Sequence, residues 1–283
     1  MNDEEIRPHT DAIVNRMFTT TADQNYILAR VAFVAKLDWD FFWLSLHALE
    51  KYMKATLLLN GLAANRNRGH DLIALYKEIK KIDRRLEYGP FVQPPYEGFF
   101  WREITVDKFL VRLNAYGSPD NRYNLYGYTI SLDDLFKVDQ LIWSARRLCK
   151  RLKEHLADGD WSTDVDWIDI LQRNPERWSI DQSLPLEKLL LSDDDALLQP
   201  FVRNMNFAFA PDHLHQVDTI RLTAHNPPLV AWFDRLKSND ASIETKETSA
   251  AVLGWVKKNI KLSKNDAHEL DDVLAAYRSG RST

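Results

Sequence analysis

The chain has 283 residues, enough for one large domain or two ordinary ones, and 45% of them are apolar, which excludes a disordered chain. It has no apolar run of the roughly 18–20 residues that a membrane-spanning helix needs. Its acidic start, Met1 to Glu5, has no apolar signal region, and its single cysteine, Cys149, excludes an internal disulfide and a thiolate zinc site. We therefore expect a cytoplasmic protein that does not enter a membrane and has no metal or other cofactor.

The net charge of −4 is unevenly distributed along the chain. Residues 1–156 carry 23 Lys and Arg against 20 Asp and Glu, which gives +3, whereas residues 157–283 carry 14 against 21, which gives −7. This balance is not that of a strongly basic nucleic-acid-binding protein, but it allows a local basic surface in the first half. The opposite signs also permit the second half to cover such a surface.

The hydrophobic pattern predicts an all-α fold. Residues 1–21, which include Pro8 and a run of three threonines, are expected to be a partly ordered lead-in. Apolar residues then recur at steps of three and four, the period of a helix. They predict helices at about 23–61 (with a break near 36–38), 71–86, 106–116 and 132–156.

The last of these helices carries seven residues at alternating steps of three and four. They are Leu135, Val138, Ile142, Ala145, Cys149, Leu152 and Leu156. This heptad pattern is typical of packing in a helical bundle or against a second subunit. Cys149 belongs to it, so we expect the thiol to be buried.

A domain boundary is expected near residue 157, where Asp158, Gly159 and Asp160 interrupt the pattern. Residues 157–283 are expected to form a helical region of unknown type, with no strands. Short helices are predicted near 185–192, 194–208, 212–224, 228–238, 248–261 and 264–278.

Four short motifs follow one another in the first half. They are HALEKYMKA at 47–55, GHDLIAL at 69–75, the Arg122-Tyr123 pair, and a W-x-x-R-R-x-C pattern at 143–149. In this order they resemble the motifs of HEPN domains, helical modules of prokaryotic defence and toxin–antitoxin proteins. The resemblance covers residues 22–156 and implies an up-down helical bundle that forms a homodimer.

One departure from the family's pattern bears on function. Ribonuclease members carry R-x4-6-H, whereas Arg66–His70, Arg151–His155 and Arg221–His225 each have three intervening residues. The chain therefore resembles the non-ribonuclease branch, which implies a non-catalytic binding and dimerisation module for a nucleotide or RNA, in a defence, toxin–antitoxin or regulatory context. Two alternatives stay open. One is an atypical metal-independent ribonuclease that uses Arg66 and His70, and the other is a structural adaptor that binds a protein partner.

The candidate ligand-binding residues are basic or aromatic. They are Lys51, Lys54, Arg66, Arg68, His70, Arg122 and Tyr123. Lys51 and Lys54 share a stripe with His47 on one helix, and this stripe is either an anion-binding face or a solvated face supported by a Glu50–Lys54 ion pair. His70 either contacts phosphate at a helix N-terminus or packs under its loop while Asp71 caps the helix.

Two further groups of charged residues have a structural alternative. The basic end of the 132–156 helix (Arg146, Arg147, Lys150, Arg151, Lys153) suits nucleic acid, but the helix dipole alone also favours cations there. The acidic and histidine residues at 193–195 and 212–218 contain potential metal ligands. Their spacing on a helix points them apart, so no metal site is expected there.

Overall fold

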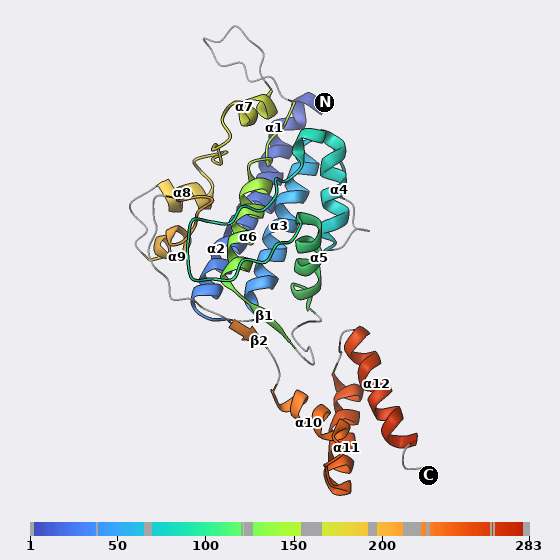
Figure 1. The fold of residues 1–283 in the computed structure, drawn as a ribbon. Coiled ribbons are helices and arrows are strands. Elements are labelled where there is room, and N and C mark those ends of the chain that lie inside the picture. The colour runs from blue at the N-terminus through green and yellow to red at the C-terminus, as the bar shows by residue number, and fades with distance from the viewer. Residues whose placement is uncertain are drawn as a thin grey trace. The chain divides into compact units, whose positions relative to one another are not determined.

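The computed structural model describes most of the chain. The described residues are 3–37, 39–64, 70–119, 121, 127–153, 166–191, 197–211, 222–224, 227–260, 262 and 264–279. Contacts divide the chain into two compact units (Figure 1). Unit 1 comprises residues 1–117 and 131–221, and unit 2 comprises 118–130 and 222–283. Both units are mainly helical, which confirms the all-α fold.

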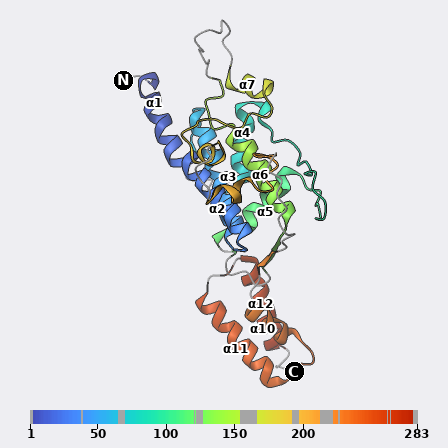
Figure 2. The same ribbon diagram turned by 90° about the vertical axis from the view of Figure 1, so that its left-hand side faces the viewer.

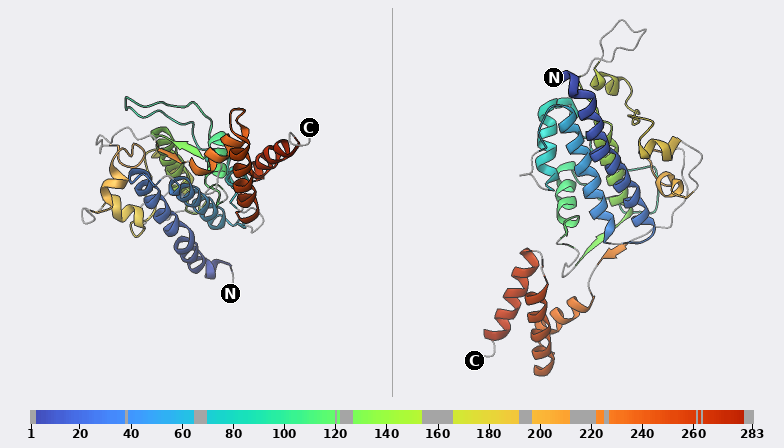
Figure 3. Two further views of the ribbon diagram at one scale, coloured as in Figure 1. Left: turned by 90° about the horizontal axis from the view of Figure 1, so that it is seen from below. Right: turned by 180° about the vertical axis from the view of Figure 1, so that it is seen from behind.

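Unit 1 begins with helical structure where a lead-in was expected. α1 (Asp3–Val14), a π-helical turn (Asn15–Thr19) and α2 (Thr20–Val34) follow one another without a break (Figure 3). The first two of these contact α3 (Asp40–Leu59). This tertiary packing outweighs the one hydrogen bond that Pro8 cannot donate within its helix.

The central element of unit 1 is α3, which contacts α2 and three later helices, α4 (Leu72–Ile82), α5 (Val106–Tyr116) and α6 (Leu132–Arg146). Its buried side chains include Phe41, Leu49 and Tyr52. The break expected near residues 36–38 is confirmed, because α2 ends at Val34 and Lys36 has a left-handed φ of 60°.

Local hydrogen bonds fix where these helices begin. The Asp71 side chain accepts from the amides of Ile73 and Ala74 at the start of α4. At the start of α6, Asp134 accepts from the Ser131 amide at 3.1 Å. α6 stops at Arg146, so the prediction that this helix continues to residue 156 is wrong. The Leu148 and Cys149 amides already bond to carbonyls three residues earlier, which tightens the chain into a turn.

The heptad residues are nevertheless core residues. Six of them, from Leu135 to Leu152, are at most 2% exposed, and Leu156 lies outside the described residues. The Cys149 thiol is buried as expected, and this burial raises its pKa to about 12. The thiol therefore stays protonated and unreactive while unit 1 is folded. Because it is the chain's single cysteine, its labelling by an alkylating reagent reports the unfolding of unit 1 alone.

Gly117 marks a close approach between the end of α5 and α3. A Cβ atom placed on Gly117 would lie 2.6 Å from the Leu46 Cβ and 2.7 Å from the Phe42 carbonyl oxygen. We therefore expect Gly117→Ala to lower the free energy of unfolding of unit 1 by about 1–3 kcal/mol, the usual cost of overpacking. Cys149 labelling against urea concentration measures this change. Gly89→Ala is the matched control, because a Cβ there meets nothing within 4 Å, and equal stability of the two variants would contradict the expected clash.

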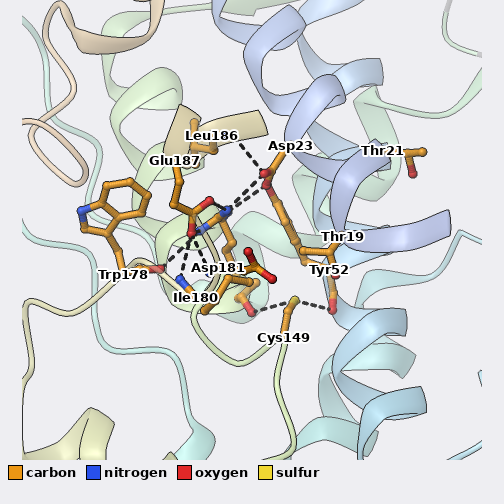
Figure 4. Close-up of polar contacts among 12 residues, drawn as sticks. Thr19, Thr21, Asp23, Tyr52, Cys149, Trp178, Ile180, Asp181, Leu186 and Glu187 are labelled. Carbon is orange, nitrogen blue, oxygen red and sulfur yellow. Dashed lines mark hydrogen bonds and ion pairs between the residues drawn. The ribbon is translucent and has the colours of Figure 1, made fainter. Parts of the chain in front are cut away.

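Three short helices complete unit 1. α7 (Trp167–Arg173), α8 (Pro185–Leu191) and α9 (Gln199–Arg203) follow in the chain, and the last two contact α2. A buried ion pair between Glu187 on α8 and Arg146 on α6 connects this region to the bundle (Figure 4). The contacts therefore do not divide the chain near residue 157, and an end of the HEPN-like part at 156 stays a prediction, since residues 154–165 lie outside the described residues.

Unit 2 combines a small sheet (Figure 1) with three helices (Figure 2). β1 (Tyr128–Ile130) pairs antiparallel with β2 (Leu222–Ala224), which corrects the prediction of a helix over 222–224 and of a chain without strands. Strands of three residues are too short to show an alternating pattern. The helices are α10 (Pro227–Lys237), α11 (Ile243–Asn259) and α12 (Lys264–Ser279). Their shared core consists of Leu229, Phe233, Leu236, Leu253, Val256, Leu270 and Leu274.

None of the helices in the described part of the chain has the length and apolar character needed to cross a membrane.

Candidate functional site

Glu50 is a residue of α3 whose buried carboxylate contacts three basic side chains. Its side chain is 6% exposed. The Oε2 atom lies 3.3 Å from the His47 Nδ1 atom and 2.7 Å from the His70 Nδ1 atom, and the Lys54 ammonium donates to Oε1. We call these four residues the Glu50 cluster. The i, i+3 and i, i+4 spacing of a helix places His47 and Lys54 beside Glu50. The contact between Lys54 and Glu50 confirms the ion pair expected from the sequence.

His70 reaches the cluster from the turn before α4. Asp71 caps α4, and the Asn114 side chain on α5 accepts from the Leu72 amide and donates to Asp71, both at 3.0 Å. These hydrogen bonds fix the position of the backbone next to His70. The His70 side chain is 56% exposed, so it is not packed beneath its loop, although the expected cap by Asp71 is confirmed.

Hydrogen bonding decides the charge of Glu50. Burial alone would raise the pKa of its carboxyl group, but hydrogen bonds from His47, Lys54 and His70 outweigh burial and lower the pKa to about 2. Glu50 is therefore ionised at ordinary pH. A fixed anion at this point orients both imidazoles through their Nδ1 atoms.

Aromatic packing holds the two imidazoles nearly perpendicular to each other. The rings of His47 and His70 lie 5.2 Å apart at 83°, and Trp43 packs edgewise on His47 at 4.1 Å. The His47 Nε2 atom is buried and has no hydrogen-bond partner among the described residues. Among the described residues, His47 therefore has a hydrogen-bond partner at Nδ1 but none at Nε2.

Of the other predicted ligand-binding residues, Lys51 lies next to the cluster on α3. Its ammonium donates to the Asn25 side chain at 2.5 Å. Burial lowers the pKa of Lys51, whereas the charge of Glu50 acts in the opposite direction. Four further candidates, Arg66, Arg68, Arg122 and Tyr123, lie outside the described residues.

The basic end of the 132–156 segment is largely engaged in internal contacts. Arg146 is fully buried between Asp23 and Glu187, Arg147 donates to the Pro175 carbonyl at 2.6 Å, and Arg151 pairs with Asp11 at 2.6 Å. These arginines therefore contribute to holding unit 1 together.

Sequence reasoning missed one group of potential metal ligands. The atoms offered by His47, Glu50 and His70 all lie within 4.8 Å of one another. The signal in the sequence was an H-x-x-E pair on one helix together with a histidine just before the next helix. The acidic and histidine residues at 193–195 and 212–218 lie outside the described residues.

No protein-family model, curated protein or solved structure matches this chain.

Proposed function

We propose that unit 1 is a HEPN-like, non-catalytic binding and dimerisation module whose Glu50 cluster contacts phosphate groups of a nucleotide or RNA. The observation that carries the proposal is an exposed imidazole, His70, held by a buried carboxylate next to two lysines. The order of the four sequence motifs supports the family, and the missing R-x4-6-H motif favours binding over catalysis. Such a module suits a prokaryotic defence, toxin–antitoxin or regulatory protein.

The chemistry of the cluster suits a phosphate oxygen. The Nδ1 atom of His70 already bonds to Glu50, so Nε2 is the ring nitrogen left for a ligand. Glu50 is ionised and holds His70 through Nδ1, and Lys54 and its neighbour Lys51 on α3 add two ammonium groups. Hydrogen bonds between such cations and phosphate are stronger than neutral ones.

Binding to labelled mixed-sequence RNA tests the proposal, with a gel shift and cleavage read from the same samples, with and without EDTA. We expect intact RNA and a shift that weakens as salt is added, because phosphate contacts release counterions. We expect His70→Ala to weaken binding about tenfold, which corresponds to one charge-assisted hydrogen bond of roughly 1.5 kcal/mol. Lys51→Ala is expected to reduce the dependence of binding on salt.

The matched control is Lys257→Ala in unit 2. Lys257 also pairs with a carboxylate, that of Asp271, and its side chain is 49% exposed. If the Lys257 and His70 variants bind RNA equally well, the Glu50 cluster is not the binding site.

One observation favours a second function, that of an atypical metal-independent ribonuclease. An exposed histidine oriented by a buried carboxylate at 2.7 Å is an arrangement that can transfer protons. Cleavage that persists in EDTA and disappears in His70→Ala would establish this function and replace the binding module. With neither a shift nor cleavage, the role of an adaptor for a protein partner would remain.

A further inference from the structure

Three potential ligand atoms in the Glu50 cluster converge on one point. The His47 Nδ1 and His70 Nδ1 atoms lie 3.3 and 2.7 Å from the same Glu50 oxygen, Oε2. Around a tetrahedral zinc ion with bonds of about 2.1 Å, ligand atoms are separated by roughly 3.4 Å. The ligand atoms here, all within 4.8 Å of one another, therefore need only small movements to surround a metal ion.

We propose that His47, Glu50 and His70 bind a zinc ion. Two imidazoles and one carboxylate form a donor set that zinc uses when three protein ligands leave a fourth position open. Calcium and magnesium prefer oxygen ligands alone, so the two imidazoles favour a transition metal. The exposed side of His70 leaves room for water or a phosphate oxygen at the fourth position. This inference goes beyond the proposed function and does not require RNA.

Zinc binding replaces the two hydrogen bonds to Oε2. Each imidazole must present an unprotonated Nδ1 to the metal and carry its proton on Nε2, and a ring that is doubly protonated must release one proton. For His47 the proton moves to Nε2, a buried atom that has no hydrogen-bond partner among the described residues.

Lys54 is the cationic group that opposes a metal ion in this cluster. Its ammonium contacts Oε1, the carboxylate oxygen that the metal does not need. Replacing Lys54 with Met removes this positive charge and leaves all three ligands in place. We expect Lys54→Met to bind zinc several-fold more tightly, an effect that a purely structural role of the cluster does not produce.

The test uses the full chain, stripped with EDTA and desalted, with zinc added alone in competition with a chromophoric chelator. We expect one zinc ion per chain, and the visible absorption of a tetrahedral site when cobalt(II) is used instead. Loss of a supporting partner costs a metal site roughly 10- to 100-fold in affinity. His70→Ala removes a ligand, so its affinity is expected to fall by at least about 100-fold.

The matched control is His268→Ala in unit 2. His268 also faces a carboxylate, that of Asp272 at 3.5 Å, but this pair is highly exposed. The control is expected to leave zinc binding unchanged, and Cys149 labelling verifies that each variant is folded. Zinc bound equally by the wild type and His70→Ala, or no zinc bound by the wild type, would overturn the inference.

The same samples separate this inference from the proposed function. RNA binding that persists after EDTA treatment, in a protein that binds no zinc, leaves the phosphate-binding module standing and removes the metal site. Stoichiometric zinc without an RNA shift retains the metal site and removes the nucleic-acid role.

Discussion

Arg146→Met is expected to lower the free energy of unfolding of unit 1 by about 3–5 kcal/mol, the cost of breaking a buried ion pair by removing one partner. The Arg146 guanidinium lies between two carboxylates, those of Asp23 and Glu187, and all three side chains are 0% exposed. Methionine has a similar length but no charge, so the variant leaves two buried anions without their shared cation.

The surrounding hydrogen bonds explain why the two carboxylates tolerate burial in the native protein (Figure 4). Arg146 donates to both oxygens of Asp23, at 2.8 and 3.1 Å, and to both oxygens of Glu187. The Tyr52 hydroxyl and the Leu186 amide also donate to Asp23, and the Ile180 amide donates to Glu187 at 2.8 Å. Burial alone would lower the pKa of Arg146, but the neighbouring Asp23 charge outweighs it and raises the pKa. Arg146 therefore stays charged, and a network whose hydrogen-bonding capacity is nearly filled depends on this one arginine.

Urea unfolding followed by Cys149 labelling measures this effect in unit 1 without interference from unit 2. Arg151→Met is the matched control, because the Arg151–Asp11 pair is partly exposed and should contribute no more than about 1 kcal/mol. Glu187→Gln is expected to cost less than Arg146→Met, since Arg146 and Asp23 still neutralise each other. A cost for Arg146→Met no greater than that of the control would show that the buried cluster does not stabilise the fold.

Arg146 also shows where sequence reasoning succeeds and where it fails. The period of apolar residues predicts the helices and most of the core, because burial of one helix face depends on local spacing. The same local reasoning assigned Arg146 to a basic helix end. Its partners are 123 and 41 residues away in sequence, and no local pattern predicts such contacts.

The same difference between local and distant contacts explains why only part of the candidate site was predicted. The Glu50–Lys54 pair and the Asp71 cap follow from positions within one helix, so the sequence was sufficient to identify them. The contact between His70 and Glu50 joins the turn before α4 to α3 across 20 residues and depends on how α3 and α4 pack. The metal-ligand geometry of the cluster was missed because it requires this contact.

Asp139→Asn is expected to destabilise unit 1 by an amount comparable to Arg146→Met, about 3–5 kcal/mol. Asp139 and Arg30 form a second fully buried ion pair, between α6 and α2. Burial raises the pKa of Asp139, although Arg30 and Tyr26 favour its ionised form. Asparagine keeps the size of the side chain but removes the charge, so Arg30 would be left with the carbonyls of Phe201 and Asn204.

Two further variants separate the charge from the hydrogen bonds in this network. The Tyr26 hydroxyl donates to Asp139 at 2.8 Å and accepts from the Nδ2 atom of the Asn206 side chain at 2.9 Å. Tyr26→Phe removes these bonds without leaving an unpaired charge, and we expect a cost of about 1 kcal/mol. Asp169→Asn in the partly exposed Arg85–Asp169 pair is the matched control and should cost no more than that.

Cys149 labelling against urea concentration again provides the measurement. If Asp139→Asn is no more destabilising than Tyr26→Phe, then the carbonyl oxygens of Phe201 and Asn204 are sufficient partners for the Arg30 charge, and the Arg30–Asp139 ion pair does not stabilise unit 1. A large cost for Asp139→Asn alone would instead mean that the Arg30–Asp139 pair stabilises unit 1 through opposite charges that only the folded chain brings within reach.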